Sequence, residues 1–127
     1  MCGICGVIHL DGQPIEPDVL QAMNNALTHR GPDDAGYYIN DNVGLAMRRL
    51  SIIDVAGSPQ PLYNEDESVG VVFNGEIFNF QALRDQLTQA GHQFHTGGDG
   101  ETIAHLYEDH QVETAHYLRG QFAFAAW

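Results

Sequence analysis

Positive charge is scarce in this sequence. Its 127 residues contain no lysine and only five Lys or Arg against 17 acidic residues, which leaves a formal net charge of -12. Nucleic acids and anionic membrane surfaces attract Lys and Arg, so this balance disfavours both as partners. Arginine suits planar, two-point recognition of a carboxylate. We therefore expect a small anionic substrate to meet one local cationic spot on an otherwise acidic surface.

Long apolar segments are also missing. No run approaches the roughly 18 residues of a membrane-spanning helix, and the start, Met1-Cys2-Gly3-Ile4-Cys5, lacks the basic head of a signal peptide. These observations predict a cytoplasmic protein that does not act at a membrane. Hydrophobic residues make up 43% of the chain. That share is enough for a packed core, and the length predicts a single domain with no internal boundary.

Cysteine is limited to Cys2 and Cys5. Two residues between cysteines is a spacing found in redox and zinc sites, but a structural zinc site needs four ligands and the chain has no second cysteine pair. A redox pair normally opens a helix, whereas residues 3–8 read as a strand. The histidines match no H-E-x-x-H pattern, so we interpret them as surface or core residues and predict no metal and no cofactor in residues 1–127.

Hydrophobic spacing and turn residues outline the expected elements. Strands that first form hairpins and later alternate with helices favour an α+β or layered α/β architecture. The expected elements are a strand at 3–10, a helix from Pro17, a hairpin of 36–40 with 43–48, a strand at 69–73 ending on Asn74-Gly75-Glu76, a helix capped by Asn79 and stopped by Gly91, a short strand around Phe94, a helix carrying Ile103, and a strand from Phe122.

Cys2 offers the first candidate for chemistry. If Met1 is removed, the thiol and the free α-amine sit on one residue, and an amine that titrates near about 7.7–8.0 is a usable base at neutral pH. A terminal nucleophile activated by its own amine is an established arrangement. Taken alone, however, Cys2 is more readily interpreted as an ordinary small hydrophobic residue.

Three further segments have both a structural and a functional interpretation. Asn74-Gly75 is either a turn or an oxyanion site, in which the Asn amide and a Gly backbone N–H donate to the substrate. Arg49, or its neighbour Arg48, is either solvated or a carboxylate ligand. Asp99 lies within a glycine-rich loop that is either a helix N-cap or a phosphate cradle, and the G-x-x-x-x-G-K-[ST] pattern of a phosphate cradle is absent.

The order of these segments resembles the glutaminase domain of asparagine synthetase, a class II (N-terminal nucleophile) glutamine amidotransferase. The resemblance covers essentially the whole chain and rests on several blocks in fixed order. They are Met1-Cys2-Gly3-Ile4, His29-Arg30-Gly31-Pro32-Asp33, Arg49-Leu50-Ser51-Ile52-Ile53-Asp54, Gln60-Pro61-Leu62-Tyr63-Asn64, Phe73-Asn74-Gly75-Glu76-Ile77-Phe78-Asn79, Gly98-Asp99-Gly100-Glu101 and Leu118-Arg119-Gly120-Gln121-Phe122-Ala123-Phe124.

The resemblance implies a four-layer α/β/β/α fold with two antiparallel sheets between helices. It also implies a reaction in which Cys2 attacks the side-chain amide of glutamine and forms a thioester, which water then hydrolyses to glutamate. The implied site residues are Asn74 and the Gly75 N–H for the oxyanion, Arg49 for the α-carboxylate, Asp99 for the α-ammonium with Glu76 close by, and the backbone of Ile52 and Ile53 as pocket lining.

The resemblance further implies a longer enzyme. Ammonia would pass to a C-terminal synthetase domain, a carbon–nitrogen ligase that uses ATP and magnesium to convert aspartate to asparagine. The resemblance is also compatible with a homodimer. Residues 1–127 would then be an incomplete glutaminase domain, because the apolar end from Phe122 to Trp127 stops within an expected buried strand. Two alternatives stay open at this point. One is a glutaminase serving another acceptor, and the other is a non-enzymatic thiol or metal-binding module that uses Cys2, Cys5 and histidines.

Overall fold

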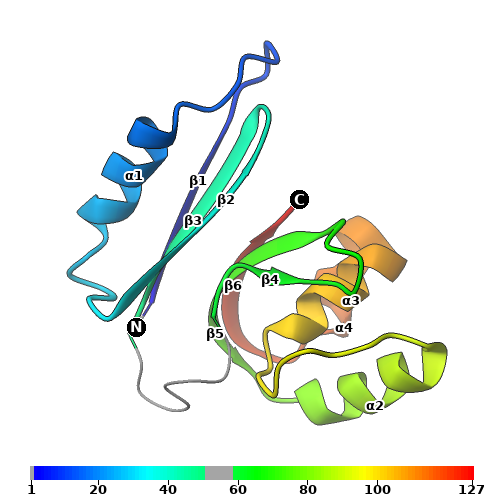
Figure 1. Cartoon of the computed structure of the whole chain (residues 1–127). Coiled ribbons are helices and arrows are strands. Elements are labelled where there is room, and N and C mark those ends of the chain that lie inside the picture. Colours follow the sequence, from blue (N-terminus) through cyan, green and yellow to red (C-terminus); the bar gives the residue numbers. More distant parts are fainter. Residues whose placement is uncertain (1, 51–58) are drawn as a thin grey trace.

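Two antiparallel sheets lie face to face, each covered on its outer side by helices (Figure 1). The computed structural model describes residues 2–50 and 59–127. The first sheet has the order β1-β3-β2 and the second the order β4-β5-β6. The strands are β1 (Gly3–Ile8), β2 (Asp34–Asn40), β3 (Val43–Arg49), β4 (Leu62–Tyr63), β5 (Gly70–Ile77) and β6 (Gly120–Ala126).

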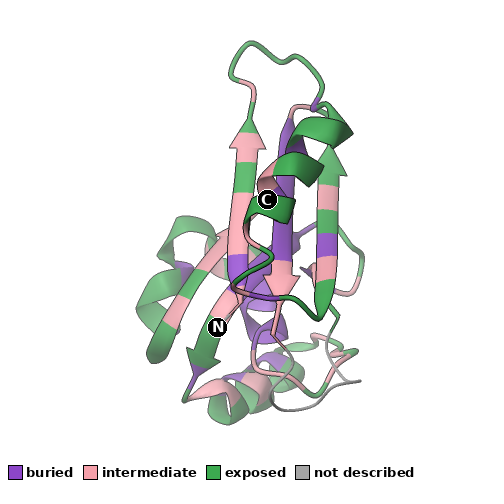
Figure 2. Cartoon of the chain, turned by 90° about the vertical axis from the view of Figure 1, so that its left-hand side faces the viewer, coloured by how far each residue is buried: buried purple, intermediate pink, exposed green. Residues whose placement is uncertain are grey.

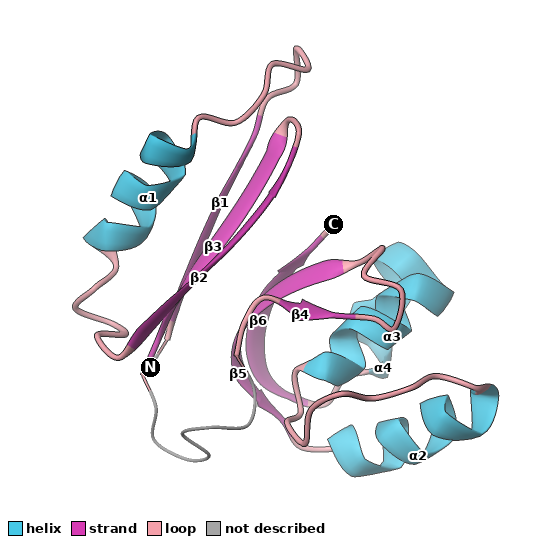
Figure 3. Cartoon of the chain, in the orientation of Figure 1, coloured by secondary structure: helices cyan, strands magenta, loops and turns pink. Residues whose placement is uncertain are grey.

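The helices complete four layers in the order helix, sheet, sheet, helices (Figure 3). One helix covers the first sheet and the others cover the second, which confirms the predicted α/β/β/α arrangement. They are α1 (Pro17–Ala26) on the first sheet, and α2 (Phe80–Ala90), α3 (Glu101–His110), the 3-10 turn η1 (Gln111–Glu113) and α4 (Thr114–Tyr117) on the second. In the described part of the chain, no helix is long and apolar enough to span a membrane.

Three apolar clusters hold these layers together. The largest lies between the second sheet and its helices and includes Val71, Phe73 and Ile103. A second lies between the sheets and joins Met47 of β3 to Val72 of β5, and a third lies under α1. Consequently β3, the central strand of the first sheet, is buried along most of its length, whereas its neighbours are partly exposed (Figure 2).

The structure corrects several local expectations. The strand expected to end at Asn74-Gly75-Glu76 continues as β5 to Ile77, because β6 pairs along its whole second half. Residues 92–96 form no strand, so the one predicted around Phe94 is wrong. Two short elements, β4 and α4, were not predicted. Each is too short for a repeat of apolar residues to be recognised in the sequence.

Asn79 stands at the N-terminus of α2 as predicted, but its side chain makes no capping hydrogen bond. Instead its Nδ2 donates to the carbonyl oxygen of Tyr117, and its Oδ1 accepts from the N–H of Arg119, both at 2.9 Å. Asn79 therefore joins the start of α2 to the segment entering β6. The other end of α2 agrees with expectation, since Gly91 ends it in a left-handed conformation with φ of 113°.

Candidate functional site

Cys2 lies half-buried between the two sheets, just before β1. Its side chain packs on the inter-sheet cluster that contains Met47 and Val72. The backbone N–H of Leu50 donates to its Sγ at 3.4 Å, and Arg30 Nε donates to its carbonyl oxygen at 3.1 Å. The thiol is thus held at the end of β3, the strand that carries Arg48 and Arg49.

Cys5 faces the other side of the same sheet. It packs on the cluster under α1 with Ile15 and Leu20, because successive strand residues alternate between faces. Burial raises the pKa of the Cys5 thiol. The two thiols therefore do not share a site, which removes the geometric basis for a module that uses both as ligands of one metal.

A cleft of about 580 Å³ opens at the end of β5 nearest α2. It brings together residues from β3, β5 and the glycine-rich loop before α3. Predicted residues among them are Arg49, Gly75, Glu76 and Asp99. The full lining is Arg49, Gln60, Leu62, Phe73, Gly75, Glu76, Ile77, Phe78, Phe80, Gly97, Gly98, Asp99 and Gly100.

The β5–β6 register decides where the backbone groups of β5 point. Gly70 and Trp127 exchange both backbone hydrogen bonds at 2.8 and 3.0 Å, and Phe78 N–H donates to Arg119 at 2.7 Å. In an antiparallel pair, hydrogen-bonded and non-hydrogen-bonded positions alternate. Even-numbered residues of β5 therefore bond β6, and the odd-numbered Phe73, Gly75 and Ile77 direct their backbone groups to the opposite edge, beside the cleft.

Side chains occupy this edge on both sides of Gly75. The Gln60 amide bonds both backbone groups of Phe73: its Nε2 donates to the Phe73 carbonyl at 2.9 Å and its Oε1 accepts the Phe73 N–H at 2.7 Å. The Asp99 Oδ2 accepts the N–H of Ile77 at 2.7 Å. By the same alternation, the Gly75 N–H is directed to this edge between the two capped positions, and Gly75 itself lines the cleft.

Glycine is required at position 75. Its φ is 144°, a conformation that L side chains rarely adopt. A Cβ built there would also collide with the backbone carbonyl oxygen of Gln121 on β6. Gly75 therefore stays within the strand while its backbone is turned differently from that of its neighbours, so the turn interpretation of Asn74-Gly75 is wrong.

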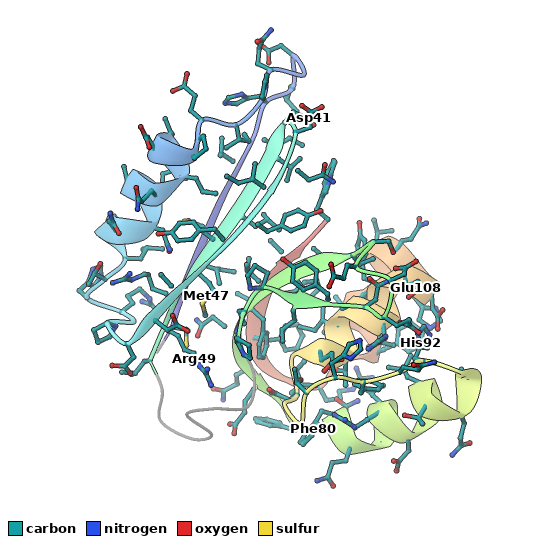
Figure 4. All side chains as sticks on the ribbon, viewed as in Figure 1. Asp41, Met47, Arg49, Phe80, His92 and Glu108 are labelled. Carbon is teal, nitrogen blue, oxygen red and sulfur yellow. The ribbon has the colours of Figure 1, made fainter. Side chains whose placement is uncertain are left out.

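Strand alternation also places Asn74 and separates the two arginines. Asn74 shares a face of β5 with Val72, which packs in the inter-sheet cluster beside Cys2. On β3, Arg48 Nε donates to the carbonyl oxygen of Gly31 at 3.1 Å. Its neighbour Arg49 lines the cleft and projects from the end of β3 toward β5 (Figure 4).

The remaining predicted residues have mixed outcomes. The N-cap of α3 is Gly100 and no side chain caps it, so the capping interpretation of Asp99 is wrong. Its carboxylate joins the loop to β5 instead. Glu76 is exposed at the cleft. Ile52 and Ile53 lie outside the described residues. Gln60 belongs to one of the blocks that carry the resemblance but had no predicted role, because its hydrogen bonds to Phe73 are visible only in three dimensions.

Comparison with known proteins gives a consistent result. The family described as "Glutamine amidotransferase domain" matches residues 1–127. The chain is 42% identical over 130 residues to glutamine-hydrolysing asparagine synthetase 1 of Bacillus subtilis, covering 100% of this chain and 21% of that protein. It is 45% identical over 125 residues to glutamine-hydrolysing asparagine synthetase 3 of Arabidopsis thaliana, covering 98% and 21%.

Solved structures share the fold at much lower identity. An allosteric regulatory enzyme of purine biosynthesis superimposes with a TM-score of 0.78 at 19% identity, over 100% of this chain and 35% of that one. A glutamine phosphoribosylpyrophosphate amidotransferase from B. subtilis gives 0.71 at 20% identity, again over 100% and 35%. These chains have the same two-sheet arrangement with flanking helices.

Proposed function

The chain belongs to the glutamine amidotransferase domain family, and from this premise we propose that it hydrolyses glutamine through Cys2. The domain is homologous to the glutaminase part of asparagine synthetases. The observation that carries the proposal is the edge of β5. There Gly75 lines a cleft together with Arg49 and Asp99. Cys2 packs on the inter-sheet side of the same strand, the face that alternation gives to Asn74, and neither residue is among those that line the cleft.

The first step is attack by the thiol. After removal of Met1, the α-amine of Cys2 takes the thiol proton, and the sulfur bonds to the carbon of the glutamine side-chain amide. The carbonyl electron pair moves onto oxygen. When this electron pair re-forms the carbonyl, the carbon–nitrogen bond breaks and the nitrogen takes the proton. Ammonia departs, and a glutamyl thioester remains on Cys2. Water then cleaves the carbon–sulfur bond, which releases glutamate and restores the thiol.

The oxyanion needs donors that are already in place. We assign the backbone N–H of Gly75 and the Asn74 side-chain amide to this role. Gln60 and Asp99 hold the flanking positions Phe73 and Ile77, so the Gly75 N–H is fixed between two anchored residues. Donors that need no rearrangement during the reaction stabilise the developing charge most effectively.

Free glutamine carries opposite charges on its α-carbon, so its site needs a cation and an anion held apart. Arg49 and Asp99 enter the cleft from different elements and provide this pair, with exposed Glu76 close by. The Asp99 Oδ2 is held by the Ile77 N–H, which leaves Oδ1 to meet the ammonium. Ile52 and Ile53 are proposed as further lining through their backbone.

The chain spans 21% of the length of the Bacillus and Arabidopsis relatives, so the use of ammonia is a separate proposal. We assign it to a synthetase domain that amidates aspartate with ATP and magnesium, in a cytoplasmic carbon–nitrogen ligase of asparagine biosynthesis. The names of the relatives support this acceptor. A different acceptor on the same glutaminase domain is the alternative, and ammonia-dependent amidation of aspartate by the complete enzyme distinguishes the two.

The test of the glutaminase proposal is covalent labelling combined with ammonia release. A diazo-ketone analogue of glutamine should modify Cys2, and Cys2→Ala should abolish both labelling and ammonia release. Cys5→Ala is the matched control and should retain most activity, because Cys5 lies on the opposite face of the sheet. Labelling at Cys5, or ammonia release that survives Cys2→Ala, would overturn the assignment.

A further inference from the structure

Two buried histidines meet two glutamates on the helical side of the second sheet, away from the cleft. They are Glu65, His92, His105 and Glu108, and one donor atom from each lies within 4.8 Å of the others. Glu65 lies between β4 and β5, His92 follows α2, and the other two share a face of α3. Figure 4 shows His92 and Glu108 near one another beside α3.

The Nδ1 atoms of both imidazoles point into this cluster. His92 Nδ1 lies 3.1 Å from Glu65 Oε1 and 3.8 Å from Glu108 Oε2. His105 Nδ1 lies 2.9 Å from Glu65 Oε2, yet it makes no hydrogen bond within the described residues. The His105 side chain is fully buried, at 0% exposure. A buried ring nitrogen without a hydrogen bond is a costly feature that a bound ion would remove.

The opposite ring nitrogens face a second set of carboxylates. His92 Nε2 lies 3.1 Å from Asp109 Oδ2, and His105 Nε2 lies 3.5 Å from Glu101 Oε1. In metal sites, a ligating histidine usually donates its other N–H to a carboxylate or carbonyl, which fixes the tautomer and orients the ring. Both histidines here have that arrangement, with Nδ1 toward the cluster and Nε2 toward an outer carboxylate.

The surrounding contacts hold Glu108 and His92 in place. Asn64, which is fully buried, donates from Nδ2 to Glu108 Oε2 at 2.9 Å. The backbone N–H of His92 donates to the carbonyl oxygen of Leu87 at 3.0 Å, across the glycine that ends α2. These contacts position the ligands before any ion arrives, which lowers the cost of binding.

Charge favours a cation at this position. Among the described residues, the ion-pair partners of Glu65, Glu108, Asp109 and Glu101 are the two imidazoles alone.

We propose that Glu65, His92, His105 and Glu108 form a closed structural site for a divalent first-row transition metal, with zinc as the preferred occupant. Two imidazole nitrogens and two carboxylate oxygens suit tetrahedral zinc, whereas magnesium and calcium favour oxygen-only sites. Zinc bonds of about 2.0–2.2 Å place tetrahedral ligands roughly 3.3 Å apart. Three of the separations between these donor atoms are 2.9, 3.1 and 3.8 Å, and all four atoms lie within 4.8 Å of one another, so the side chains must draw together to close around the ion.

Such an ion would join three segments that are distant in sequence: the β4–β5 turn, the end of α2, and α3. With all four positions filled by protein, it would have no open coordination site for substrate. Its expected effect is therefore on stability and not on glutamine chemistry. This role is independent of the proposed glutaminase activity, and its tests need no activity measurement.

The experiment uses the purified, tag-free protein that carries this chain, stripped of metal by a chelator and then loaded with zinc or cobalt. We expect one zinc per chain after dialysis, a higher melting temperature with zinc, and the visible absorption of four-coordinate cobalt without a thiolate band. Absence of stoichiometric zinc binding would overturn the proposal. So would a thiolate charge-transfer band, which would place the metal at Cys2 or Cys5.

Two amide variants test the ligands with little change in shape. Glu65→Gln and Glu108→Gln should each weaken zinc binding at least tenfold and remove most of the zinc-dependent rise in melting temperature. In Glu108→Gln the side-chain oxygen can still accept from Asn64, so this variant removes the charge and keeps that contact. His116→Gln is the control, since the His116 side chain is 78% exposed. Unchanged zinc affinity in both amide variants would overturn the proposal, and the four residues would then form an ion-pair network and no metal site.

Discussion

The Oδ2 atom of Asp99 accepts the backbone N–H of Ile77 at 2.7 Å. This bond attaches the glycine-rich loop before α3 to the last residue of β5. It satisfies an N–H that the β5–β6 ladder leaves unpaired, and it fixes a negative charge at the wall of the cleft. A residue that looks like a helix cap in the sequence thus connects the strand to the loop that lines the cleft.

Asp99→Asn and Asp99→Ala should separate these two roles. The Asn side-chain oxygen can still accept from Ile77, so Asp99→Asn should keep the melting temperature near that of the wild type. It loses the charge that meets the glutamine ammonium, so KM for glutamine should rise. Asp99→Ala should show the same rise and also a lower melting temperature. Wild-type KM in Asp99→Asn would show that the carboxylate only supports the loop.

Arg49→Ala and Arg48→Ala form a matched pair of neighbouring arginines. Arg49 lines the cleft, whereas Arg48 bonds the carbonyl of Gly31. Loss of one partner of a desolvated charge pair costs about 2–5 kcal/mol, so Arg49→Ala should raise KM for glutamine roughly thirtyfold or more. Arg48→Ala should mainly lower the melting temperature. Steady-state ammonia release and thermal melting provide the measurements, and equal KM values would show that the wrong arginine was chosen.

Much of the fold follows from local sequence signals, and the exceptions have a common cause. Pro17 opens α1 and Gly91 closes α2 because both act within one or two residues. By contrast, Asn74-Gly75 normally signals a turn, and only pairing with Phe122 and its neighbours, far along the chain, keeps it in a strand. Non-local pairing overrides the local preference there, and no period or turn rule contains that information.

The candidate site likewise contains residues that the sequence identifies and residues that only the structure brings together. Arg49 and Asp99 were identified because they belong to blocks whose order resembles a family. Gln60 was missed because its function is to replace a missing strand partner for Phe73. His92 and His105 were missed as a pair because their sequence spacing matches no metal motif. They meet only because Gly91 ends α2 where the chain returns alongside α3.

Cys5 should react slowly with iodoacetamide in the folded protein. Burial raises the pKa of Cys5, so at a given pH it has less of the reactive thiolate than an ordinary thiol. Its modification in the folded protein should be slow at neutral pH and accelerate only as pH rises beyond the ordinary thiol range. Peptide mapping by mass spectrometry, with the chain unfolded in guanidinium as control, checks this. Equal rates for Cys5 in both states at neutral pH would contradict it.

Asn74→Ala tests the side-chain half of the oxyanion site. Loss of one such donor typically lowers kcat about 10²–10³-fold. Because the oxyanion exists only in the transition state and the intermediate, KM for glutamine should change little. Asn74→Asp keeps the shape but replaces the donor with a negative charge, and it should be at least as impaired. A variant with normal kcat and a raised KM would make Asn74 a contact to bound glutamine instead.

Gly75→Ala tests whether the backbone of β5 must take its unusual conformation. Alanine is disfavoured at the φ of 144° that Gly75 adopts, a strain of about 1–3 kcal/mol, and its Cβ would press on the Gln121 carbonyl. The β5–β6 pair must then shift, which should lower the melting temperature and move the N–H that faces the cleft.

Gly97→Ala is the matched control for Gly75→Ala. Gly97 also lines the cleft, but a Cβ at that position meets nothing within 4 Å, and its φ lies outside the left-handed range. Ammonia release per folded molecule, measured with circular dichroism on the same samples, should fall sharply for Gly75→Ala and little for Gly97→Ala. If Gly75→Ala melts and hydrolyses glutamine like the wild type, the strand edge tolerates a side chain there. The Gly75 N–H would then not need the fixed position between Phe73 and Ile77 that the oxyanion assignment requires.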